Sequence, residues 1–163
     1  MLLINGCSAS KPTLDQIVHN PHSMTTALKA LNSNFSVQVL SSGMDNFNYV
    51  RISVLKLNNV PVVAAISQTN SSNETFVSIL ANAHNNSIGN KLFSSNSAIK
   101  RQPGMLIKNV LLKDIPNPKI VSYLLSLGYA SNQTIISRQS HFYYNSETMD
   151  ILEYILPAIR QYL

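Results

Sequence analysis

The sequence has 163 residues, of which 45% are hydrophobic and 12% are charged, and its net charge is +5. This length predicts one globular domain that spans residues 1–163. The positive charge favours an anionic partner, but Lys and Arg do not cluster and no zinc-finger spacing occurs, which argues against nucleic acid. No apolar segment reaches the length of a membrane span. The single cysteine, Cys7, excludes an internal disulfide and fits a cytoplasmic protein.

Apolar periodicity predicts a chain that mixes helices with consecutive strands. Helical spacing of apolar residues predicts helices over residues 13–18, 23–31, 73–84 and 117–129. Period-two alternation predicts strands over residues 35–42, 48–57, 61–68, 99–112, 134–144 and 148–159. Tight turns at Asn58–Asn59 and Asn145–Ser146 make their flanking strands antiparallel. We therefore expect an α+β fold with a single antiparallel sheet of about six strands and helices packed outside it.

The usual signatures of metal, nucleotide and nucleophile chemistry are missing from the sequence. His19 and His22 are close in sequence, but Pro21 separates them and no acidic residue completes a ligand set, so we expect no metal site. The five glycines form no Gly-x-Gly or Walker pattern, and no Gly-x-Ser-x-Gly elbow occurs. We therefore expect neither a nucleotide cofactor nor a serine nucleophile.

The charged residues inside the predicted strands include Glu153, which shares a strand face with Ile151 and Ile155, and two arginines, Arg51 and Arg138. An ionised carboxylate buried without a partner costs several kcal/mol, so Glu153 needs a partner if it is buried. One interpretation is a structural ion-pair network. The other is a water-poor pocket for a small carboxylate, which an arginine fork binds bidentately while Glu153 hydrogen-bonds the ligand or moves a proton on it. The residue types leave both interpretations open.

Four stretches, taken in order, resemble the chorismate lyase family. They are "SMTTALKALNSNFSVQVLSSG", "VRISVLKLNNVPVVAAIS", "NNSIGNKLFSS" and "SRQSHFYYNSETMDILEYILPAI". The resemblance covers most of the chain from about residue 20 onward. It implies a six-stranded antiparallel sheet with an internal ligand site under helical flaps. It also implies a carbon–oxygen lyase that converts chorismate to 4-hydroxybenzoate and pyruvate without a metal or organic cofactor, an activity associated with ubiquinone biosynthesis.

The resemblance also implies roles for particular residues. By position in the quoted stretches, Met24 contacts the ligand, Arg51 binds its carboxylate, Ile88 replaces a flap leucine and Glu153 lies near the ring hydroxyl. Arg51 and Glu153 are then the expected catalytic residues, and Met24, Ile88 and Arg138 complete the expected substrate site.

Two features depart from the family pattern. Ile66 stands where the family often has an arginine in the third strand, so one positive charge is missing unless Arg138 or Arg101 replaces it. Residues 109–129 look like an insertion relative to the shortest members, which would reshape a flap or cover a sheet edge.

We therefore expect a monomeric, cytoplasmic chorismate lyase that acts on chorismate, releases 4-hydroxybenzoate and has no nucleic acid or membrane partner. The alternative is a non-catalytic domain of the same fold that binds a small aromatic carboxylate. This alternative arises because the fold also resembles the effector-sensing domain of some transcription regulators, and the missing arginine suits binding without turnover. A third interpretation is a degenerate relative with only a structural role.

Overall fold

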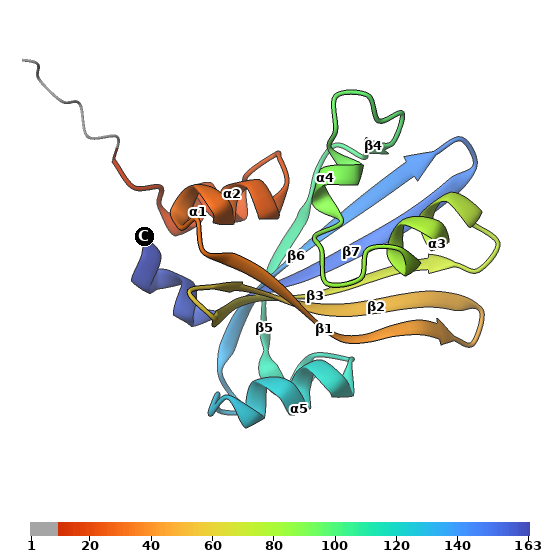
Figure 1. Ribbon diagram of the computed structural model, residues 1–163. Helices are drawn as coiled ribbons and strands as arrows, with labels where there is room; N and C mark the ends of the chain where they lie inside the picture. Colours follow the sequence, from red (N-terminus) through yellow and green to blue (C-terminus); the bar gives the residue numbers. More distant parts are fainter. Residues whose placement is uncertain (1–9) are drawn as a thin grey trace, which may run out of the picture.

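The computed structural model describes residues 10–163, so Cys7 lies outside the described residues. Seven strands pair in one antiparallel sheet, with the order β1-β2-β3-β7-β6-β4 and with β5 also paired to β6 (Figure 1). The strands are β1 (Phe35–Asp45), β2 (Asn48–Leu57), β3 (Val60–Asn70), β4 (Lys100–Arg101), β5 (Leu106–Leu111), β6 (Thr134–Tyr144) and β7 (Glu147–Ile155). The expected α+β class with a single antiparallel sheet is confirmed, with seven strands in place of about six.

Two-residue turns set the register of three hairpins in this sheet. Asn46, Asn58, Asn59 and Asn145 all have positive φ, between 46° and 65°. Asparagine tolerates this left-handed region, which the tight turns of β-hairpins require. The turns expected at Asn58–Asn59 and Asn145–Ser146 are therefore confirmed, and a third hairpin joins β1 to β2.

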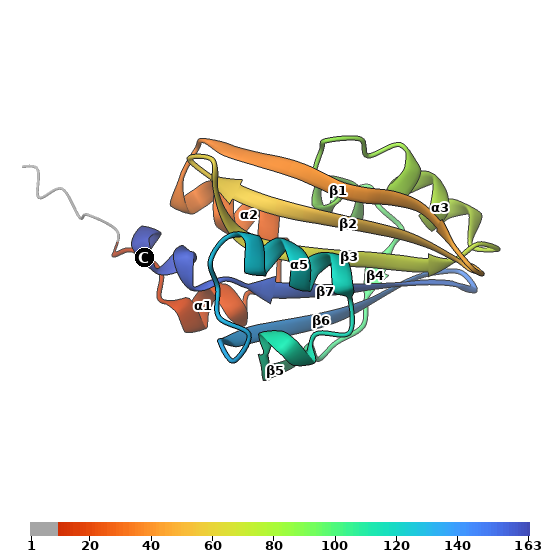
Figure 2. The ribbon, with the colours of Figure 1, turned by 90° about the horizontal axis from the view of Figure 1, so that it is seen from below.

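Helices cover both faces of the sheet, as Figure 1 and the perpendicular view in Figure 2 show. One face carries α1 (Leu14–Val18), α2 (Met24–Leu31), α3 (Glu74–Ala81) and α4 (Gly89–Leu92). The opposite face carries α5 (Pro118–Ser126). Two 3₁₀ helices complete the chain, η1 (Leu112–Asp114) and η2 (Pro157–Tyr162). The Asn117 side chain caps α5 by accepting from the backbone N–H groups of Lys119 and Ile120.

The two largest differences between predicted and observed strands each have a local reason. The strand expected over residues 99–112 is divided into β4 and β5, because the chain turns at Pro103–Gly104, where Gly104 has φ of 82°. The last strand ends at Ile155 and not at residue 159, because Pro157 lacks an N–H group for a sheet hydrogen bond and η2 begins there.

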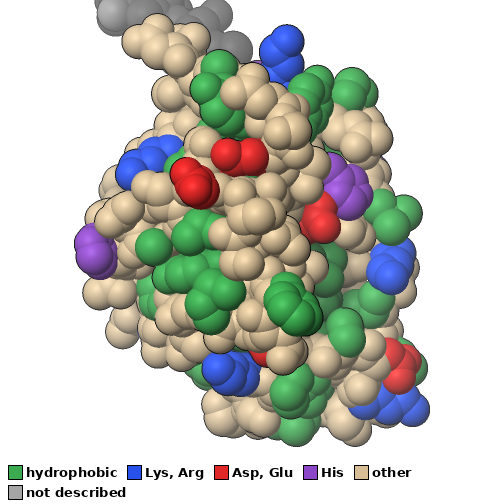
Figure 3. All heavy atoms as spheres, turned by 90° about the vertical axis from the view of Figure 1, so that its right-hand side faces the viewer, with side chains coloured by type: hydrophobic (Ala, Val, Ile, Leu, Met, Phe, Trp, Pro, Cys, Tyr) green, Lys and Arg blue, Asp and Glu red, His purple; other side chains and the backbone are tan. Residues whose placement is uncertain are grey.

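The surface view in Figure 3 shows charged side chains of both signs scattered among uncharged ones, without a contiguous basic patch on that side of the molecule. The longest helix in residues 10–163 is α5, with nine residues, and the helices of this region lack the length and apolar character that crossing a bilayer requires.

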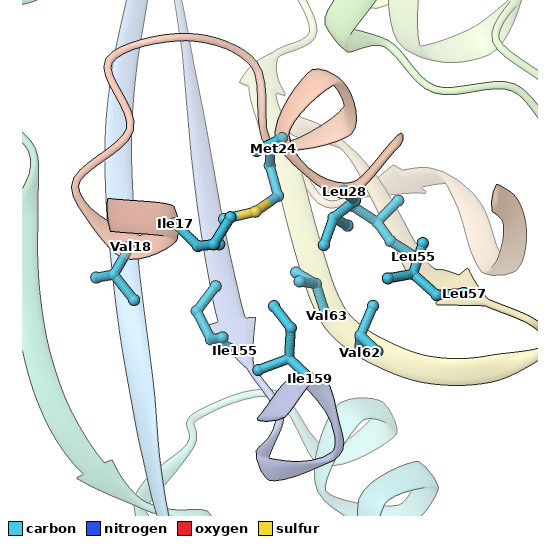
Figure 4. Packing of buried hydrophobic residues seen from close by; sticks show 11 residues of the cluster. Ile17, Val18, Met24, Leu28, Leu55, Leu57, Val62, Val63, Ile155 and Ile159 are labelled. Carbon is cyan, nitrogen blue, oxygen red and sulfur yellow. The ribbon is translucent and has the colours of Figure 1, made fainter. Parts of the chain in front are cut away.

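Three hydrophobic clusters hold the helices to the sheet. Figure 4 shows the first, in which Met24 and Leu28 of α2 pack with sheet residues that include Val63 and Ile155. A second cluster packs α3 and the 83–92 segment on the same face of the sheet, against Phe142 and neighbouring residues. The central cavity described below lies on this face, lined by members of both clusters.

The third cluster lies on the opposite face and corrects the expected role of residues 109–129. Ile120 and Leu124 of α5, together with Leu112 of η1, pack against β-strand residues such as Ile52 and Tyr154. The segment therefore neither reshapes a flap nor merely covers a sheet edge. It supplies the apolar layer of the second sheet face, which would otherwise expose those residues to water.

Candidate functional site

Period-two alternation places two rows of mostly polar side chains across the centre of one sheet face. Because β2, β3, β7 and β6 are neighbours, their paired residues form two adjacent rows. The first row runs Arg51, Ser67, Ile151, Ser140, and the second runs Ser53, Ala65, Glu153, Arg138. Residues two apart in a strand point to the same face, so both rows face the side that carries α2, α3 and α4.

Two short segments form the roof over these rows. One is the N-terminal turn of α2 with Ser23, Met24 and Thr25, and the other runs from Ser87 through α4 to Phe93. The hydroxyl groups of Thr25 and Ser87 are hydrogen-bonded to each other and join the two segments. A Cβ atom on Gly89 would collide with Ser23 Oγ, so the absence of a side chain at Gly89 permits this close approach.

The two rows of side chains and the two roof segments together line the central cavity. The cavity has a volume of about 50 Å³. The apolar walls are Met24, Leu55, Ala65, Ile88, Leu92, Phe93, Phe142 and Ile151. The ionisable groups of the lining are three arginines, Arg51, Arg101 and Arg138, and one acid, Glu153, so the cavity favours an anion.

Glu153 is only 7% exposed and is paired with Arg138. Arg138 Nε donates to Glu153 Oε2 at 2.7 Å, and its Nη1 donates to the backbone oxygens of Val18 (3.5 Å) and Asn20 (3.2 Å). The two residues are direct cross-strand partners in the β6–β7 hairpin. An ion pair with additional hydrogen bonds offsets much of the cost of burying the carboxylate.

Arg51 is 2% exposed and holds the segment between α3 and α4. Its Nη2 donates to the backbone oxygens of His84 at 3.0 Å and Asn86 at 2.8 Å. Burial lowers the pKa of Arg51 below the ordinary arginine value, while nearby Tyr49 acts in the opposite direction. The guanidinium is thus desolvated, which strengthens its attraction for an anion that enters the cavity.

Arg101 reaches the cavity from β4. It donates to the backbone oxygen of Pro21, and its guanidinium lies 5.3 Å from the centre of the Phe93 ring. Burial lowers the pKa of Arg101, as does the positive charge of Arg138, and Glu153 opposes them. Each arginine of the cavity therefore donates to backbone oxygens of a covering segment, either residues 18–21 or residues 84–86.

All five residues proposed from the sequence line the central cavity: Met24, Arg51, Ile88, Arg138 and Glu153. The structure thus brings these five residues together at one site. Ile66 is different, because its side chain belongs to the cluster on the α5 face. An arginine is therefore not missing from the cavity at that position.

Sequence reasoning missed the hydroxyl-bearing part of the lining. Ser140 and Ser53 lie two residues from Arg138 and Arg51 on the same strands, so period-two alternation could have found them. Ser23, Thr25 and Ser87 come from the roof segments, and no strand pattern indicates them. Within residues 10–163, no group of three or more His, Cys, Asp or Glu side chains is placed to hold a metal ion.

No protein-family model and no curated protein matches the sequence. The fold does resemble solved structures. The C-terminal domain of the histidine utilization repressor from Pseudomonas syringae has a TM-score of 0.54 at 8% identity, over 76% of this chain and 92% of that chain. The possible transcriptional regulator YydK from Bacillus subtilis has a TM-score of 0.52 at 16% identity, over 76% of this chain and 58% of that chain.

A third similar structure is a ligand-binding domain assigned to the GntR family of transcriptional regulators, from Bordetella bronchiseptica. Its TM-score is 0.50 at 12% identity, over 77% of this chain and 87% of that chain. At such identities the likeness shows the fold alone, the arrangement of one antiparallel sheet with helices.

These comparisons correct the expectation of a chorismate lyase. The similar structures just named are regulators or domains of regulators, and none is described as an enzyme. The physical reason for the wrong prediction is that the four resembling stretches encode the sheet, the turns and the buried polar rows. A fold and its pocket can serve binding without turnover, so these stretches do not indicate catalysis.

Proposed function

We propose that residues 1–163 form a non-catalytic domain that binds a small aromatic carboxylate, with 4-hydroxybenzoate as the first candidate. The observation that carries the proposal is the charge of the central cavity, whose lining has three arginines and one glutamate among apolar walls. A buried excess of positive charge is costly without an anion, and a flat ring fits walls made of aliphatic and aromatic side chains. The ligand-binding domain from Bordetella bronchiseptica, which shares the fold, supports this class of function.

Arg51 is the residue that binds the ligand carboxylate in this proposal. Its Nη2 donates to His84 and Asn86 and its Nη1 to Ser53 Oγ at 3.4 Å, whereas its Nε–H donates to no group within residues 10–163 and is the donor left for the ligand carboxylate. Glu153 has one oxygen on Arg138, and its second oxygen accepts from the ring hydroxyl of the ligand. Met24 and Ile88, which are 3% and 8% exposed, pack against the ring from the roof.

Calorimetric titration with 4-hydroxybenzoate tests the proposal. We expect the wild type to bind it and Arg51→Met to bind it about 10- to 100-fold more weakly, because a charge-assisted hydrogen bond contributes about 1.5–3 kcal/mol. If Arg51→Met fails to fold, Arg51→Lys, which keeps the positive charge but not the planar guanidinium, is titrated in its place. Arg160→Met is the matched control, since Arg160 is exposed on η2 and outside the cavity lining. Release of pyruvate from chorismate by the wild type, or no binding of 4-hydroxybenzoate, would overturn the proposal.

A further inference from the structure

The hydroxyl oxygen of Ser140 is the one completely buried side-chain polar atom within residues 10–163 that has no hydrogen-bond partner. The residue is 3% exposed and lines the central cavity from the middle of β6. Buried hydroxyl groups are almost always hydrogen-bonded, so a hydroxyl without a partner beside a cavity indicates that its partner is a molecule bound there. The position lies beside the gap between β4 and β5, which pair with β6 on either side of it.

The sheet register places this hydroxyl next to the group that meets the far end of the ligand. Ser140 pairs with Ile151, and Glu153 follows two residues later on the same face of β7. Diagonal neighbours of this kind have Cα atoms roughly 7–8 Å apart, and both side chains line the central cavity. A ring substituent that reaches Glu153 therefore has Ser140 beside its neighbouring ring position.

We infer that Ser140 recognises a second oxygen of the ligand, on the ring carbon next to the one whose hydroxyl meets Glu153. This inference rests on the proposed function and narrows its ligand class to aromatic carboxylates with adjacent oxygen substituents. The simplest probe of that class is 3,4-dihydroxybenzoate, and 4-hydroxybenzoate is the same molecule without the second oxygen.

The test compares the binding of these two probes to the wild type, to Ser140→Ala and to a matched control, Ser137→Ala. Ser137 lies on the same strand but pairs with Tyr154 of the α5-face cluster, and its hydroxyl donates to the backbone oxygen of Lys108 at 3.3 Å. We expect the wild type to bind 3,4-dihydroxybenzoate roughly fivefold more tightly than 4-hydroxybenzoate, because one additional hydrogen bond contributes about that much to affinity. Ser140→Ala abolishes this preference and Ser137→Ala retains it.

Thermal unfolding without ligand gives a second readout that a structural role for Ser140 would not produce. Removing an unpaired hydroxyl leaves the midpoint of Ser140→Ala equal to or above that of the wild type, whereas Ser137→Ala falls by about 2–4 °C. Three results would overturn this inference and leave the proposed function standing. They are equal affinity of the wild type for both probes, a preference that persists in Ser140→Ala, and a midpoint of Ser140→Ala lowered as much as that of Ser137→Ala. Binding of neither probe to the wild type would overturn the proposed function and this inference with it.

Discussion

Loss of one member of the buried Arg138–Glu153 pair should destabilise the protein by an amount that depends on which member is lost. In Arg138→Met the carboxylate of Glu153 keeps its burial but loses its cation, and the backbone oxygens of Val18 and Asn20 lose their donor. Removing one partner of a buried pair costs about 3–5 kcal/mol. In Glu153→Gln the amide oxygen still accepts from Arg138 and both backbone contacts remain, so we expect a loss of only about 1–3 kcal/mol.

The double variant Arg138→Met, Glu153→Leu separates the pair energy from the loss of packing. It removes both charges and fills the space with apolar side chains, so its stability should exceed that of Arg138→Met alone. The free energy of unfolding is measured by urea titration at pH 7, where urea adds no ionic screening. A double variant less stable than Arg138→Met would refute the view that Glu153 depends on its pairing with Arg138 in the folded protein.

Three further predictions address other parts of the fold. Burial raises the pKa of Tyr154 to about 12, so its stabilising contribution is complete below pH 10 and is lost as pH rises from 10 to 12. The free energy of unfolding should fall over that range by up to roughly 2–3 kcal/mol more in the wild type than in Tyr154→Phe, and identical pH profiles would contradict this. Gly89→Val should push the roof segments apart and weaken 4-hydroxybenzoate binding several-fold, whereas Asn90→Val, at an exposed neighbouring position, should leave binding unchanged. Equal losses of affinity in the two variants would contradict close packing at Gly89. Leu124→Ala should cost about 2–5 kcal/mol of stability without changing ligand affinity, because Leu124 is buried on the α5 face. A weakened affinity in that variant would show that α5 contributes to the site.

The sequence pattern was sufficient to group the charged residues of the site. Alternation along a strand is a geometric property of the backbone, so Arg51, Arg138 and Glu153 could be placed on strand faces without coordinates. The two-residue turn at Asn145–Ser146 even determines that Arg138 faces Glu153, because positions equally distant from such a turn are paired. The ion pair could therefore have been predicted from the turn that the sequence already indicated.

Other parts of the site depend on contacts that no local pattern encodes. Arg101 enters the cavity because β4 pairs with β6 for two residues before the chain turns at Pro103–Gly104. Which face of the sheet α5 covers follows from the path of the chain after β5, and the amphipathic pattern of α5 would be the same on either face. The sequence also could not show whether the pocket binds a ligand or converts it, because pockets with the same residue types occur in both kinds of protein.

The most direct test of the central claim compares the affinities of 4-hydroxybenzoate and its uncharged analogue 4-hydroxybenzamide for the wild-type protein. The two molecules have nearly the same shape, so their difference reports the charge selectivity of the cavity. With three guanidinium groups and one carboxylate in the lining, the anion should bind at least about tenfold more tightly, the worth of one charge-assisted contact. Equal affinities, or a preference for the amide, would contradict the account of an anion-binding cavity.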